Sequence, residues 1–112
     1  MDELLVFTTA DSPDVARTIA MGLVENHEAA CVSIIPGLRS IYRWQGKICD
    51  DGEWLLLVKS TRSRFEAVRA RIRGLHSYDL PEIVAVPLTD GDPAYLQWLN
   101  DQLHPPQAGA AL

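Results

Sequence analysis

Four polar or titratable side chains lie close together in one short segment: His76, Tyr78, Asp79 and Glu82. Imidazole and carboxylate groups at this spacing predict either a metal site or an acid–base cluster. Pro81 restricts Leu80 to an extended backbone, which holds the segment open and places Glu82 at the start of a strand. A solvated loop whose histidine caps the preceding helix explains the same residues. The residues alone favour this structural explanation over the functional one.

A second candidate surface comes from the long apolar segment in the first half of the chain. Asp51-Gly52 is a strong signal for a two-residue hairpin turn. A turn there places Trp44 opposite Lys59 on the paired strands, with Tyr42 on the same face. Two aromatic rings beside an ammonium group predict either a small-molecule or anion pocket, or an aromatic face buried against another subunit. The spacing favours the second explanation, which makes Tyr42 and Trp44 interface residues.

The two cysteines, Cys31 and Cys49, lie near opposite ends of one extended segment. A disulfide between them needs a severe bend, so two free thiols in a reducing compartment are the simpler interpretation. Cys31 lies among apolar residues and acts most simply as a small hydrophobe. As a soft ligand it suits copper(I) or zinc, but only beside a second sulfur or imidazole, and no CxxC or HxxxH spacing supplies one.

Composition limits the function classes. The 112 residues carry a formal net charge of −5, with 47% hydrophobic and 22% charged residues, values typical of a single globular domain. An acidic chain argues against a nucleic-acid partner, which needs a basic face. The first residues lack the features of a secretory signal, and no apolar run is long enough to span a membrane. We therefore expect a cytoplasmic protein without a membrane partner.

Catalytic motifs are missing from the sequence. No Walker loop, GxGxxG, GxSxG or HExxH pattern occurs, and no nucleophile is spaced with a base. We therefore expect no enzyme activity and no organic cofactor.

The elements that must position these residues follow an α+β order. Periodicity, caps and turn residues predict strands and helices in the order β-α-β-β-α-β, with a further helix at the end. The expected elements are a strand at Leu4–Thr9, a helix from Ser12 to Asn26-His27, strands at Ala30–Ile48 and Trp54–Thr61, a helix through Phe65–Leu75, an edge strand at Glu82–Leu88 and a helix after Asp92-Pro93. This order is that of the ferredoxin-like split βαβ sandwich, an antiparallel sheet with both main helices on one face. We expect one domain over 1–103 and a disordered tail over 104–112.

The segment Ala30–Ile48 predicts an oligomer. It is extended almost throughout, with one break at Pro36-Gly37. At roughly 3.3 Å per residue it spans roughly 55 to 60 Å. A domain of this length, with a radius of gyration of about 13 Å, is only about 35 Å across. A ribbon that long must bend or project, and a projecting apolar ribbon needs a partner.

Three segments carry a resemblance to a known family: 29–37 (AACVSIIPG), 40–47 (SIYRWQGK) and 76–83 (HSYDLPEI). They closely resemble the CutA family, the divalent-cation tolerance proteins, and the resemblance runs in order from about Leu4 to Leu103. It implies a ferredoxin-like homotrimer whose long β-ribbons pair between subunits. It also implies an architecture similar to that of the PII signalling trimers, whose ligands bind in clefts between subunits.

The resemblance also implies site residues and an association with divalent-metal tolerance and copper binding. Residues that would line the cleft between subunits are Trp44 and Lys59 on the ribbon, and His76, Tyr78 and Glu82 on the loop. Some family members carry a cysteine near the end of the first strand and a histidine pair before the Tyr-x-x-Pro-Glu motif. Here Thr8 and Leu75-His76 occupy those positions, so two of three soft copper ligands are replaced. The candidate metal ligands are therefore His76, Cys31 and Glu82.

Three functions follow as hypotheses. The first is a homotrimer that binds copper or zinc and contributes to cation tolerance. The second is a PII-like regulatory trimer that binds a small anionic metabolite in the cleft between subunits, anchored by Lys59 and Trp44. The third is an enzyme that uses Glu82 as a base, and it ranks last because no motif defines a reaction.

Overall fold

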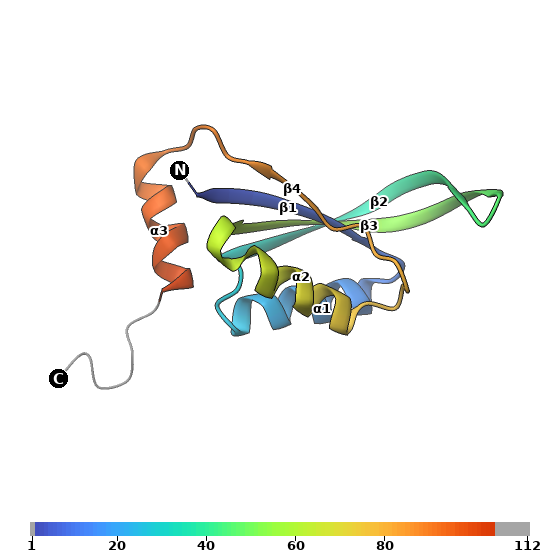
Figure 1. The fold of residues 1–112 in the computed structure, drawn as a ribbon, viewed down its shortest axis with the longest axis horizontal. Helices are drawn as coiled ribbons and strands as arrows, with labels where there is room; N and C mark the ends of the chain where they lie inside the picture. The colour runs from blue at the N-terminus through green and yellow to red at the C-terminus, as the bar shows by residue number, and fades with distance from the viewer. Residues whose placement is uncertain (1, 105–112) are drawn as a thin grey trace.

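The computed structural model describes residues 2–104, which form a four-stranded antiparallel sheet with three α-helices (Figure 1). The elements are β1 (Glu3–Ala10), α1 (Pro13–Glu25), β2 (Cys31–Trp44), β3 (Lys47–Thr61), a 3₁₀ turn η1 (Arg62–Arg64), α2 (Phe65–Leu75), β4 (Val84–Pro87) and α3 (Pro93–Leu103). The strand order is β2-β3-β1-β4, so β4 is an edge strand, as Pro87 predicts. The expected ferredoxin-like α+β fold is confirmed. Of the predicted tail, only His104 is among the described residues.

Local signals set the helix boundaries. The Ser12 hydroxyl accepts a hydrogen bond from the Val15 amide (3.1 Å), and Pro13 occupies the first turn of α1. The Asp92 carboxylate does the same for the Tyr95 amide (3.1 Å) at the start of α3. Both starts lie where the sequence predicts them.

The core lies between the sheet and the α1–α2 layer (Figure 1). Its fully buried side chains come from both: Val6, Leu56 and Val58 from the sheet, Ala16, Ile19 and Leu23 from α1, and Val68 and Ile72 from α2. In each helix these residues recur at helical spacing, so one face of α1 and one face of α2 are removed from water. Among the described residues no helix is both long enough and apolar enough to cross a bilayer.

The hairpin turn differs from the prediction. Strands β2 and β3 are joined at Gln45-Gly46, where φ is +50° and +80°, and Trp44 pairs with Lys47 across the turn. Positive φ at both central residues is the geometry of a tight type I′ hairpin, which glycine favours at the second position. The predicted turn at Asp51-Gly52 is wrong, because Gly52 lies inside β3 opposite Arg39.

The corrected register changes which side chains face one another. Lys59 lies opposite Cys31, not opposite Trp44. The two strands also shift register between Ile35 and Leu38, at the predicted Pro36-Gly37 break, where Gly37 has a φ of +84°. The expected pairing of Trp44 with Lys59 is therefore wrong.

The predicted projecting ribbon is present, but it consists of two paired strands and not of one long strand. The segment expected as one strand through Ile48 is divided by the turn, and the far halves of β2 and β3 together extend past the helices (Figure 1). The molecule measures 58 × 29 × 22 Å. At the end of the ribbon, Ile41 and Ile48 are 72% and 69% exposed, an arrangement that favours burial against another chain.

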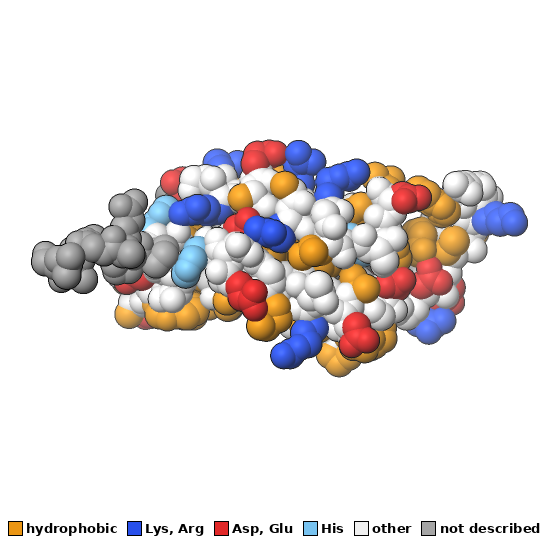
Figure 2. All heavy atoms as spheres, turned by 90° about the horizontal axis from the view of Figure 1, so that it is seen from below, with side chains coloured by type: hydrophobic (Ala, Val, Ile, Leu, Met, Phe, Trp, Pro, Cys, Tyr) orange, Lys and Arg blue, Asp and Glu red, His pale blue; other side chains and the backbone are white. Residues whose placement is uncertain are grey.

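The sheet face that α1 and α2 leave uncovered is also apolar over much of its area. Side chains alternate across a strand, so the neighbours of buried Val6 and Val58 point to this second face. It carries Leu5, Phe7, Leu57, Val84 and Val86 in facing positions. The view from the helix side shows basic and acidic side chains intermixed, with hydrophobic side chains toward the ribbon and also along the lower edge of the view (Figure 2).

Candidate functional site

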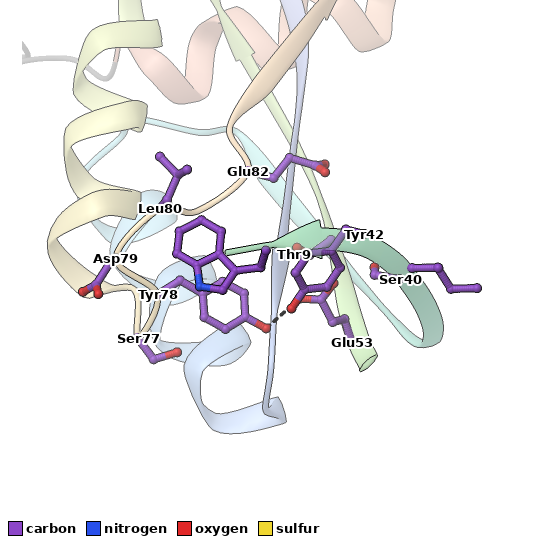
Figure 3. Close-up of a pocket in the computed structure, with 11 residues that line it drawn as sticks. Thr9, Ser40, Tyr42, Glu53, Ser77, Tyr78, Asp79, Leu80 and Glu82 are labelled. Atoms are coloured by element: carbon purple, nitrogen blue, oxygen red, sulfur yellow. Dashed lines mark hydrogen bonds between the residues drawn. The ribbon is translucent and has the colours of Figure 1, made fainter. Parts of the chain in front are cut away.

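A cavity of about 630 Å³ lies where the ribbon meets the loop between α2 and β4 (Figure 3). Three aromatic residues line it: Tyr42 and Trp44 from β2, and Tyr78 from the loop. Three carboxylates line it as well: Glu53 from β3, and Asp79 and Glu82 from the loop. No lysine or arginine is among the described residues that form its wall. The cavity is therefore aromatic and acidic.

His76 fixes the loop to β1. Its Nε2 lies 2.6 Å from the Thr9 carbonyl oxygen, an acceptor, so Nε2 carries the proton and donates. Its Nδ1 then accepts a hydrogen bond from the Tyr78 amide (3.0 Å). The two rings also lie against each other, with centroids 4.7 Å apart. Both ring nitrogens are engaged, so His76 orients Tyr78 and has no lone pair left for a metal in this arrangement.

A hydrogen bond between two lining residues of the cavity joins Tyr78 to Glu53. The Tyr78 hydroxyl donates to Glu53 Oε2 at 2.6 Å (Figure 3). Burial raises the pKa of Tyr78, and the hydrogen bond to the carboxylate raises it further. Glu53 itself is only 5% exposed. A phenol held protonated beside a buried carboxylate is a stable hydrogen-bond donor, not a general base.

Tyr42 completes the aromatic wall from the ribbon. Its hydroxyl donates to Asp51 Oδ2 at 2.5 Å, and this hydrogen bond is the main reason that its pKa rises to about 12. Tyr42 and Trp44 are 41% and 43% exposed. Because they lie two residues apart on one strand, both rings face the same side of the ribbon.

The predicted cleft residues Trp44, Tyr78 and Glu82 all line this one cavity. Lys59 does not line this cavity of the single chain. Its ammonium group donates to the Tyr95 hydroxyl on α3 (3.1 Å), a contact that raises the pKa of Lys59. Cys31 Sγ lies 3.6 Å from the same hydroxyl. Lys59 and Cys31 thus belong to the contact between the sheet and α3.

The predicted metal ligands His76, Cys31 and Glu82 are not assembled into a centre. Within residues 2–104, no three His, Cys, Asp or Glu side chains are grouped so that they could hold a metal ion. Of the three, Glu82 lines the cavity and is exposed. Cys31 and Cys49 are free thiols.

Sequence reasoning missed Glu53, the most buried acidic group of the site. The misplaced turn put Glu53 directly beside a hairpin end, where a charged residue is unremarkable. In the observed register Glu53 lies within β3 opposite Leu38. The available signal was a glutamate directly before the apolar run Trp54–Val58, because a charge at the edge of a buried strand needs a partner.

Comparison of the sequence with protein-family models identifies the family of this chain. The family model described as CutA1 divalent ion tolerance protein matches residues 4–102. The chain belongs to the CutA1 family. The resemblance of the three motifs is thereby confirmed across nearly the whole chain.

Individual CutA relatives agree in sequence and in fold. The chain is 52% identical over 99 residues to the divalent-cation tolerance protein CutA of Thermus thermophilus, covering 88% of this chain and 96% of the relative. The crystal structure of CutA from Xylella fastidiosa is similar with a TM-score of 0.90 and 41% identity, over 92% of this chain and 99% of that one. The chloroplastic CutA protein of Arabidopsis thaliana is 37% identical over 98 residues and 88% of this chain, which spans about half (54%) of that longer relative.

Proposed function

We propose that this CutA chain works as a homotrimer that binds divalent cations, copper or zinc among them, and thereby contributes to divalent-cation tolerance. The family membership supports the general role in cation tolerance. The single observation that carries the binding proposal is the acidic lining of the cavity, with Glu53, Asp79 and Glu82 on its wall.

Carboxylate oxygens are suitable ligands for zinc and copper(II). Zinc binds aspartate and glutamate oxygens as well as imidazole and thiolate, and copper(II) accepts nitrogen and oxygen ligands. The soft-ligand arrangement that would select copper(I) has no support, because Cys31 lies against α3 and both nitrogens of His76 are engaged. We therefore assign the primary ligand roles to Glu82 and Asp79, which are exposed at the cavity.

One subunit supplies only part of a coordination shell, and the proposed trimer would supply the rest. The cavity lies against the ribbon, whose apolar end is exposed in the single chain. The uncovered sheet face presents further apolar side chains, including Val84 (53% exposed) and Val86 (44%). Burying both surfaces in an assembly would place a neighbouring subunit close to the cavity.

The alternative function is a PII-like trimer that binds a small anion in the cleft between subunits, anchored by Lys59 and Trp44. Within one chain Lys59 donates to Tyr95 and lies outside the cavity, which gives this alternative less support. An anion in the cavity would meet three carboxylates. We keep the cytoplasm as the proposed location.

Calorimetric titration of the tag-free protein with Zn²⁺ and Cu²⁺ tests the proposal. We expect saturable binding at one site per subunit, weakened at least about tenfold by Glu82→Gln. Asp90→Asn is the matched control, because it removes an exposed carboxylate outside the cavity. Equal binding by Glu82→Gln and Asp90→Asn, or no binding by either, would reject the cavity as the metal site.

A further inference from the structure

Glu53 is largely buried and has no described ion-pair partner, while its second carboxylate oxygen is not among the fully buried side-chain atoms that lack a hydrogen bond. Glu53 is 5% exposed, and its described hydrogen bond is to a neutral phenol, that of Tyr78, through one of its two oxygens. Among residues 2–104 no salt bridge reaches it. A positive charge beside the open oxygen of a largely buried carboxylate is favourable. Since Glu53 lines the cavity, a cation placed there would supply that charge.

The other walls indicate which kind of cation would fit. The rings of Tyr42, Trp44 and Tyr78 line the same cavity. Aromatic faces attract organic ammonium and guanidinium groups within about 6 Å of the ring centre. Fully hydrated metal ions gain less from such walls, because they are strongly bound to water and to oxygen ligands.

Size leads to the same conclusion. A cavity of about 630 Å³ lies in the range that small organic ligands occupy, about 300–1,000 Å³. Two further carboxylates, Asp79 and Glu82, are exposed and lie on different sides of the cavity, with the Asp79 carboxylate pointing outward from the loop (Figure 3).

We propose that this cavity binds a small linear organic dication of the diamine class. One ammonium group lies against Glu53 between the aromatic rings, and the second lies beside Asp79 or Glu82. Tyr78 holds Glu53 in place through its hydroxyl, and His76 holds Tyr78 through its backbone amide. This inference goes beyond the proposed function, because it needs the cavity but not metal binding.

Calorimetric titration with butane-1,4-diamine tests it, with the neutral butane-1,4-diol as the matched ligand. We expect the diamine to bind at one site per subunit and the diol not to bind. Glu53→Gln keeps an acceptor for the Tyr78 hydroxyl but removes the charge, and it should weaken diamine binding at least about tenfold. Asp79→Asn, on the exposed loop, should weaken it by a smaller factor without affecting folding. Asp90→Asn should leave it unchanged.

Equal binding of diamine and diol would overturn the inference, as would diamine binding that Glu53→Gln and Asp79→Asn leave intact, or no diamine binding at all. A Zn²⁺ titration of the same variants separates this inference from the proposed function. Zinc binding without diamine binding rejects the organic ligand and leaves the metal proposal standing. Diamine binding without zinc binding supports the organic ligand and rejects the metal proposal.

Discussion

At the residue scale, His76 and Tyr78 act together to shape the cavity. The sequence draws attention to both, and its residues favour a histidine that caps the preceding helix over one that binds a metal. The structure instead places the imidazole between the Thr9 carbonyl and the Tyr78 amide. The contact with Thr9 joins residues 67 positions apart in the chain, so no local pattern could predict it. The role of Glu53 was not predicted, because it depends on the register of β2 and β3. The Asp51-Gly52 turn signal predicts a different register.

We predict that His76 acts as a positioning residue. His76→Ala removes the hydrogen bonds to Thr9 and Tyr78, and it should lower the free energy of unfolding by about 1 to 3 kcal/mol. Urea denaturation measures this change. Zinc affinity should fall less in His76→Ala than in Glu82→Gln. A larger loss of zinc affinity in His76→Ala, with unchanged stability, would identify His76 as a ligand.

Tyrosine ionisation gives a prediction about pH. The pKa of Tyr42 rises from 10.0 to about 12 in the folded protein, and the pKa of Tyr78 is raised by burial and by Glu53. Both folded values exceed the unfolded one, so their stabilising contribution is complete below pH 10 and is lost as the pH rises through the folded pKa. An absorbance titration at alkaline pH should show delayed phenolate formation, with a smaller delayed fraction in Tyr78→Phe. An equal delay in Tyr78→Phe would contradict the Tyr78–Glu53 hydrogen bond.

At the element scale, local chemistry predicts most of the fold. The starts of α1 and α3 follow from Ser12-Pro13 and Asp92-Pro93, because a capping side chain and a proline at the first turn act locally. The hairpin is different, since two glycine-containing pairs compete for the turn within one long extended segment. Register then depends on the whole ladder of cross-strand pairs, which local turn preference does not determine.

A matched pair of glycine variants tests the turn. Gly46→Ala places a side chain at a φ of +80° and should destabilise the protein by about 1 to 2 kcal/mol. Gly52→Ala meets only the end of the Arg39 side chain, at 3.8 Å, and should change stability by less than about 0.5 kcal/mol. Thermal unfolding of the two variants compares them. A larger loss for Gly52→Ala would place the turn at Asp51-Gly52 after all.

At the scale of the whole molecule, the exposed ribbon and the uncovered apolar sheet face predict an assembly. If subunits associate obligately, the melting temperature must rise with protein concentration. Trp44→Ala should weaken the assembly by about 2 kcal/mol, because a buried aromatic anchor commonly contributes that much. Met21→Ala on α1 is the control, since Met21 is similarly exposed (44%) on the helical side. Analytical ultracentrifugation over a dilution series measures both. A monomer at all concentrations, or a Trp44→Ala variant that associates as well as Met21→Ala, would contradict this view of the ribbon.

The most direct measurement is a crystal structure of the protein soaked in Zn²⁺, with anomalous diffraction to locate the metal. We predict a zinc peak in the cavity, about 2.0 to 2.2 Å from an oxygen of Glu82 or Asp79, with its remaining ligands contributed in part by a neighbouring subunit. Zinc found only at surface positions such as His27 or Cys49, with the cavity carboxylates unligated, would contradict cation binding at this site.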